Sequence, residues 1–198
     1  MTPDPSETIV VSDNTEITEM HLTPVMTRFI LHWGEMGSRW GVNRTVAQIH
    51  ALLYLAPGPV PADEIAETLN VARSNVSTSL KDLQGWGLVS VAHVMSDRRD
   101  HFAARSDPWE MLVTIMEQRM RREIEPTLQV LRECVQELEK DRDTPKEAKA
   151  RIENMFGFLT NITTWFDQML SLPKATVLTL MKLGAKVASF VPKAAKDS

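Results

Sequence analysis

The sequence predicts a mainly α-helical protein with a small β-hairpin: a winged helix-turn-helix followed by long C-terminal dimerisation helices. Three observations predict this fold class. Two short amphipathic helical patterns flank NVAR within residues 62–85, an alternating segment follows over 89–104, and apolar residues after Pro108 recur at helical spacing. The chain has 198 residues, 43% hydrophobic and 24% charged, which is typical of a globular protein rather than a disordered one.

Composition along the chain divides it into three regions. Residues 1–18 are expected to form a flexible acidic tail, 19–105 the winged helix-turn-helix, and 106–198 the helical dimerisation region. The formal net charge is −4, but residues 1–38 alone carry −5. The net charge therefore does not argue against a nucleic-acid partner, because binding depends on where the cations lie.

Apolar spacing predicts the first two helices. From Leu22 to Trp40, apolar residues recur at steps of three and four, and Gly41 interrupts the pattern. Asn43 is a good N-cap for the second helix, TVAQIHALLYLA, which APGPVP ends because proline cannot continue a helix. The inward-facing residues of the second helix are expected to be Val46, Ile49, Leu53 and Ala56.

The third and fourth helices form the predicted helix-turn-helix. Pro61 suits the first turn of the third helix, which faces inward through Ile65 and Leu69. In the fourth helix, Val76, Leu80 and Leu83 follow the spacing i, i+4, i+7 and must face the core, so the polar residues of 74–79 must face outward. Ser, Thr and Asn are mediocre helix formers, so their concentration indicates a surface selected for something other than stability.

The segment LVSVAHVMSDRRDHFAA predicts a two-stranded hairpin with a turn at SDRR. Arg98 and Arg99 lie at its tip, and Asp97 is expected to orient a neighbouring arginine rather than to contact DNA. His93 and His101 are expected to lie near each other across the hairpin, but too few further ligands accompany them for a metal site.

Long helices follow Pro108, and Pro126 is expected to kink or break the first of them. The 146–171 helix carries an apolar seam wider than one neighbouring helix can cover, which predicts a homodimer with this helix near its axis. A last helix over 174–190 is basic and amphipathic, and packing on the dimer is favoured over a membrane surface. The predicted dimerisation residues are Ile152, Phe158, Leu159, Ile162, Trp165, Phe166 and Met169.

This order of elements explains the polar fourth helix. A recognition helix in a major groove needs short polar side chains that allow close approach, cations for phosphates, and a basic wing. DNA contact is therefore expected along 74–79, and Arg44 at the start of the second helix is a phosphate contact or a solvated cation. The predicted DNA-binding residues are Arg44, Arg73, Ser74, Asn75, Ser77, Thr78, Lys81, Arg98 and Arg99.

Four stretches between Arg39 and Cys134 resemble the GbsR-like branch of the MarR-type winged-helix regulators: TVAQIHALLYLAPGPVPADEIAETL, ARSNVSTSLKDLQGWGLV, HVMSDRRDHF and REIEPTLQVLREC. Together they cover about half the chain in the order the family shows. The resemblance implies a homodimeric, double-stranded-DNA-binding transcriptional regulator, often a repressor at palindromic operators and sometimes relieved by a small ligand. Ala72 departs from the capping Ser or Asp with which such recognition helices often begin.

Other function classes find little support in the sequence. No catalytic motif appears, so the protein is not expected to be an enzyme or to hold a cofactor. One cysteine, no signal-peptide pattern and no long apolar run favour a cytoplasmic protein without a membrane partner. Cys134 is interpreted as a small core residue, and the five tryptophans as core more than as an aromatic cage for a quaternary amine. The alternative function is a winged helix used for protein–protein association without DNA.

Overall fold

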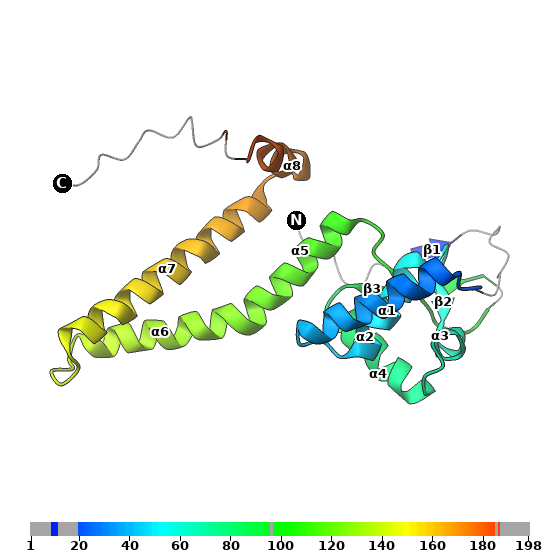
Figure 1. The fold of residues 1–198 in the computed structure, drawn as a ribbon, viewed down its shortest axis with the longest axis horizontal. Coiled ribbons are helices and arrows are strands. Elements are labelled where there is room, and N and C mark those ends of the chain that lie inside the picture. The colour runs from blue at the N-terminus through cyan, green and yellow to red at the C-terminus, as the bar shows by residue number, and fades with distance from the viewer. Residues whose placement is uncertain (1–8, 12–19, 96, 185, 187–198) are drawn as a thin grey trace. The chain divides into compact units, whose positions relative to one another are not determined.

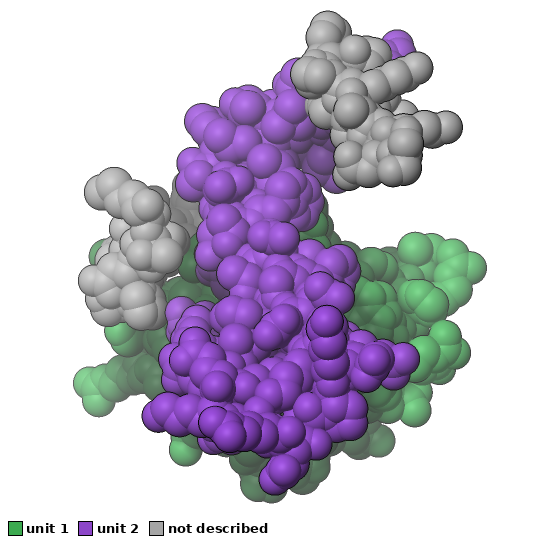
Figure 2. Space-filling model, turned by 90° about the vertical axis from the view of Figure 1, so that its left-hand side faces the viewer, with its two compact units in different colours: residues 1–116 green, residues 117–198 purple. Residues whose placement is uncertain are grey.

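The computed structural model describes residues 9–11, 20–95, 97–184 and 186. The chain forms two compact units, residues 1–116 and 117–198, which Figure 1 shows as ribbons and Figure 2 colours separately. The first unit is a winged helix, and the second is built from helices. The predicted fold class, mainly helical with a small β-hairpin wing, is confirmed.

The first two helices, α1 (Pro24–Arg39) and α2 (Arg44–Leu55), pack closely against each other. The side chain of Asn43 caps α2 as predicted, because its Oδ1 accepts the Thr45 N–H at 2.8 Å. A Cβ added to Gly37 would lie 2.6 Å from the Cβ of Ala47, so only glycine permits this approach of the two helices.

The helix-turn-helix consists of α3 (Ala62–Leu69) and α4 (Arg73–Gly85). Asn70 turns the chain between them in a left-handed conformation with φ 50°, which asparagine tolerates better than most residues. Ala72 is the N-cap of α4 and supplies no side-chain hydrogen bond, because a methyl group cannot accept one. The predicted inward-facing residues of α4 are all buried: Val76, Leu80 and Leu83.

A small sheet with strand order β1-β3-β4-β2 completes the first unit. The predicted hairpin is present as β3 (Val89–Val94) and β4 (His101–Ala104), which pair antiparallel. The short β2 (Val60–Pro61) pairs with β4, and β1 (Ile9–Val11) pairs parallel with β3. The sequence did not predict β1, which falls within the expected tail; residues 1–8 and 12–18 lie outside the described part of the chain.

The core of the first unit lies between the helices and the sheet. Met111 and Ile115 of α5 (Pro108–Arg119) also pack against it, so the beginning of this helix belongs to the winged helix. The buried core cluster consists of Ile30, Val46, Ile49, Ala51, Leu52, Leu53, Val60, Ala62, Ile65, Val76, Leu80, Leu83, Leu88, Val89 and Phe102.

A π-helical segment, η1 (Met120–Ile124), follows α5 and leads into α6 (Glu125–Leu138). The N–H of Glu125 bonds to the carbonyl of Met120, one residue further back than in an α-helix. Pro126 was expected to kink or break the helix. The regular α-helix is interrupted at this point, because α5 ends at Arg119, η1 intervenes and α6 begins at Glu125, with Pro126 in the first turn of α6.

The second unit is a helical hairpin of α6 and α7 (Lys146–Ser171), which run side by side in Figure 1 and are followed by α8 (Lys174–Leu183). The bounds of α7 are those that the sequence predicted. The last helix was expected to reach residue 190. It ends at Leu183, and residues 187–190 lie outside the described part of the chain.

Candidate nucleic-acid interface

The outward side of α4 carries seven exposed polar or charged residues, one of which is the acidic Asp82. The other six are here called the recognition face: Arg73, Ser74, Asn75, Ser77, Thr78 and Lys81. Its centre is the row Ser74, Thr78 and Lys81, spaced i, i+4, i+7 and directed away from the buried row of the same helix. Ser79 was included in the polar run expected to contact DNA, and this was wrong. It is 5% exposed and lies on the core side, because residues three apart share a helix face and Ser79 follows Val76.

Thr78 differs from the other small polar residues of the recognition face. Its hydroxyl donates to the carbonyl oxygen of Ser74, one turn earlier, at 3.1 Å. Within the described residues, the side chains of Ser74, Asn75 and Ser77 make no hydrogen bond. Their donors and acceptors therefore stay available to bases, phosphates or water, whereas the donor of Thr78 is already used.

Two of the predicted phosphate-contacting arginines are held by carboxylates of neighbouring helices. Arg73 Nε lies 2.5 Å from Asp63 Oδ1 on α3, and Arg44 Nη2 lies 3.9 Å from Glu35 Oε1 on α1. All four side chains are about half exposed, and exposed pairs of this kind contribute about 0–1 kcal/mol. A DNA phosphate can therefore replace either carboxylate at low cost. Lys81 is exposed and forms no ion pair within the described residues.

The wing tip holds one oriented and one free arginine. Arg99 donates from Nε and Nη2 to Asp97 Oδ2 at 2.9 and 2.6 Å, and its backbone N–H donates to Asp97 Oδ1 at 2.9 Å. These hydrogen bonds, the side-chain ones first, lower the pKa of Asp97 to about 2. The expectation that Asp97 orients a neighbouring arginine agrees with this geometry. Arg98 is exposed and has no partner among the described residues.

His101 supports the wing tip from inside the sheet. Its side chain is buried, and its Nδ1 lies 2.9 Å from the carbonyl oxygen of Arg99, so Nδ1–H is the donor there. Its Nε2 lies 3.4 Å from Asp97 Oδ2. The sequence alone suggested His101 only as a weak metal candidate. Asp97 and Arg99 lie in the wing turn and His101 begins β4, so the spacing of these three residues within DRRDH is the sequence signal that would have linked them.

An aromatic group joins α1 and α2. Phe29 stacks on Trp33 with ring centroids 5.5 Å apart and on Tyr54 at 6.4 Å, and Trp33 lies 6.4 Å from His50. Phe29 and Trp33 pack against the core, which favours the interpretation of these aromatics as core rather than as a cage. His50 is 3% exposed, and burial lowers its pKa to about 4.

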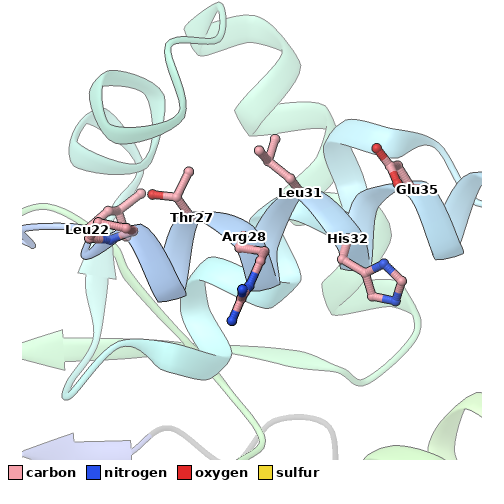
Figure 3. A pocket seen from close by; sticks show the side chains of 7 residues that line it. Leu22, Thr27, Arg28, Leu31, His32 and Glu35 are labelled. Carbon is pink, nitrogen blue, oxygen red and sulfur yellow. The ribbon is translucent and has the colours of Figure 1, made fainter.

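A shallow hollow runs along the outer side of α1 (Figure 3). Its lining comes from this one helix and the residues just before it. In Figure 3, Arg28 and His32 point one way from the helix, and Leu31 and Glu35 point the other way. Ligand pockets are usually enclosed by several elements. The hollow therefore carries no argument for an effector site.

Two further predicted features concern metal and membrane. Among the described residues, no three side chains of the metal-binding types gather where they could hold an ion, and His93 is exposed while His101 is buried. Within the same ranges, no helix combines the length and the apolar character that a bilayer span requires. Cys134 on α6 is a free, partly buried thiol.

The predicted dimerisation residues fall into two rows on α7. Ile152, Leu159, Phe166 and Met169 are partly buried. Phe158, Ile162 and Trp165 are 60%, 43% and 59% exposed, and Met155, which the prediction left out, is 52% exposed. These last four, at steps of three, four and three, form the exposed row of α7.

The family follows from the segment that holds the recognition face and the wing. Residues 40–100, from the end of α1 to the wing tip, match the model of the MarR family. This segment of the chain is therefore similar to proteins of the MarR family. The resemblance noted in the sequence is thereby confirmed. MarR-family proteins are transcriptional regulators that bind DNA, not enzymes, and the comparisons support a DNA-binding transcriptional regulator here.

Two relatives extend the match beyond this segment. The HTH-type transcriptional repressor GbsR of Bacillus subtilis (strain 168) is 21% identical over 131 residues, which are 65% of this chain and 72% of GbsR. A crystal structure described as that of a transcriptional regulator aligns with a TM-score of 0.59 and 20% identity, covering 74% of this chain and 96% of the other. This structural likeness supports the fold alone.

Proposed function

We propose that this MarR-type protein is a repressor that binds palindromic operator DNA as a homodimer. The observation that carries the proposal is the recognition face of α4. Six exposed polar or cationic side chains cover one side of a helix whose other side is fixed in the core. Such a helix fits a major groove, because its short side chains let the backbone come near the base edges.

In the proposed complex, phosphates hold the winged helix in register and α4 reads bases. Lys81 contacts a phosphate directly, and Arg73 and Arg44 exchange their carboxylates for phosphates. The wing lies over the adjacent minor groove. Asp97 holds the guanidinium of Arg99 in one orientation there, while Arg98 remains free to follow the backbone.

The exposed row of α7 supports a second copy of the chain as the partner. Met155, Phe158, Ile162 and Trp165 form an apolar stripe with the three-four spacing of a helix–helix seam. Stripes of large exposed apolar residues on a helix usually mark an interaction surface. Two-fold pairing of α7 doubles the DNA contacts and matches a palindromic site.

Repression follows if the bound dimer covers promoter DNA, and such a regulator acts in the cytoplasm. A small ligand that favoured another arrangement of the two winged helices would release the operator, because only one arrangement fits both half-sites. Neither step requires a cofactor.

The DNA contact is tested by salt-dependent binding to the DNA upstream of the protein's own gene. In fluorescence anisotropy, the logarithm of the association constant should fall linearly with the logarithm of the salt concentration. Lys81→Ala should lower that slope by about 2 per dimer, one phosphate contact being lost from each subunit. Lys140→Ala, at an exposed lysine after α6, is the control and should leave the slope unchanged. Equal slopes for wild type and Lys81→Ala would contradict the role of α4 and favour a protein–protein role for the fold.

The dimer is tested by placing a charge in the exposed row. Ile162→Glu should convert the dimer into a monomer in light scattering, because a carboxylate would be buried without a partner in the seam. Thr164→Glu, also exposed but on the other side of α7, is the matched control and should remain dimeric. A wild-type chain that is monomeric at micromolar concentration and still binds a two-half-site operator tightly would overturn the homodimer.

A further inference from the structure

The centre of the recognition face presents a methyl group rather than a hydrogen-bond donor. Thr78 occupies the middle of the outward row, between Ser74 one turn before it and Lys81 one turn after it. The Thr78 hydroxyl donates to the Ser74 carbonyl oxygen at 3.1 Å. This bond turns the hydroxyl back along the helix, and the branched Cβ then leaves the methyl group on the exposed side.

The neighbouring side chains make this position distinct. Ser74, Asn75 and Ser77 form no side-chain hydrogen bond within the described residues, so their polar atoms are free to contact bases. Among the small polar residues of the recognition face, Thr78 alone has committed its donor and alone carries a methyl group. Of the four bases, only thymine places a methyl group in the major groove.

We propose that Thr78 determines specificity by packing its methyl group against the 5-methyl group of a thymine in each half-site. This inference rests on the proposed function, because it requires α4 to lie in the major groove. A threonine methyl is a suitable partner for this contact: it is apolar, short and held in one rotamer. The flanking serines and Asn75 then supply the polar contacts on either side.

The test removes the methyl group of the thymine and the methyl group of Thr78 in separate experiments. An operator is selected from random DNA with the wild-type protein, and each thymine of a half-site is replaced in turn by deoxyuridine, which lacks only the methyl group. At one position the wild type should bind about 4-fold more weakly, the loss expected when one methyl-sized contact is no longer buried. Substitution in both half-sites should weaken binding about 16-fold if the two half-sites contribute independently.

Two variants of Thr78 assign that loss. Thr78→Val keeps a methyl group on the outward side and removes the hydroxyl. It should therefore bind the thymine operator about as tightly as wild type and, like wild type, bind the deoxyuridine operator more weakly. Thr78→Ser keeps the hydroxyl and removes the methyl group, so it should bind thymine and deoxyuridine operators equally at that position. Circular dichroism checks that both variants keep the helical content of the wild type.

The outcomes separate this inference from the proposed function. If the wild type selects no DNA sequence, both are overturned. If it selects an operator but no thymine shows a deoxyuridine loss that Thr78→Ser abolishes, the specificity role of Thr78 is wrong and the DNA-binding function stands. Weak binding by Thr78→Val together with full binding by Thr78→Ser would mean that the hydroxyl is read instead, which also overturns the methyl contact.

Discussion

Lowering the pH should destabilise the winged helix through the buried histidine of α2, His50. His50 of α2 is 3% exposed and lies against the ring of Trp33 of α1. Its Nε2 has no hydrogen-bond partner within the described residues. Burial lowers its pKa from 6.5 to about 4, because the imidazolium would lose its hydration there. The folded protein therefore holds this imidazole neutral in a pH range where the unfolded chain protonates it.

The size and the pH window follow from this pKa difference. Below pH 6.5 the unfolded state binds a proton that the folded state does not, so stability falls as the pH falls and the loss is complete near pH 4. One pKa unit corresponds to about 1.4 kcal/mol, so the whole loss is about 3 kcal/mol, of which about 2 kcal/mol is reached at pH 5. A typical domain is stable by only about 5–15 kcal/mol, so this loss is a substantial share.

The measurement is urea denaturation of the full chain between pH 8 and pH 4.5, with hydrogen exchange of α2 amides to report on the winged helix itself. His50→Leu removes the titrating group and leaves an apolar side chain among apolar neighbours, so its stability should vary much less across this range. His32→Leu, at an exposed histidine of α1, is the matched control and should keep the wild-type pH dependence. Asp97, whose pKa is lowered to about 2, would lose its contribution only below this window.

The reasoning would be refuted by equal losses of stability in the wild type and in His50→Leu between pH 7 and pH 4.5. Such a result would mean that other groups bind the protons and that water or a local opening hydrates His50 in the folded state.

Three further predictions concern the backbone. Gly37→Ala should destabilise the protein by about 1–3 kcal/mol in chemical denaturation, because its Cβ would lie 2.6 Å from that of Ala47. A denaturation midpoint equal to that of the wild type would show that α1 and α2 shift apart freely. Gly157→Ala, in the middle of α7, should instead stabilise by about 1 kcal/mol, because the added Cβ would meet nothing within 4 Å beyond the nearby backbone of its own helix; a loss of stability would show that a partner packs on that glycine. Ala72→Ser should supply the missing cap of α4 and raise stability by about 1 kcal/mol, and an unchanged melting temperature would contradict that effect.

The helices and the hairpin could be predicted because local physics determines them. The spacing of Val76, Leu80 and Leu83 fixes which side of α4 enters the core, and Asn43 marks the start of α2 through its own hydrogen bond. The strand β1 could not be predicted in this way. Three residues within an acidic segment pair with β3, and only the sheet itself supplies that partner.

The candidate site was predicted as a set of residues but not as an electrostatic arrangement. The sequence places Arg44, Arg73 and Arg99 on the expected elements, yet each one pairs with a carboxylate from elsewhere in the fold or across the wing turn. The sequence suggested the pair of Arg99 with Asp97, which lies two residues away, but the partners of Arg44 and Arg73 lie on other helices and follow only from the structure. The burial of Ser79 was predictable, because it lies three residues after Val76 and four before Leu83.

The central claim is that two copies of this winged helix read a palindrome through α4, and selection of bound sequences from random DNA tests it most directly. The wild-type protein should enrich an inverted repeat whose half-site centres lie about 10 base pairs apart, or a multiple of that, so that both recognition helices enter the major groove on one side of the duplex. Ile162→Glu should lose the enrichment of paired half-sites, and Thr164→Glu should keep it. Enrichment of a single, unrepeated site by the wild type, or of no sequence at all, would contradict the account.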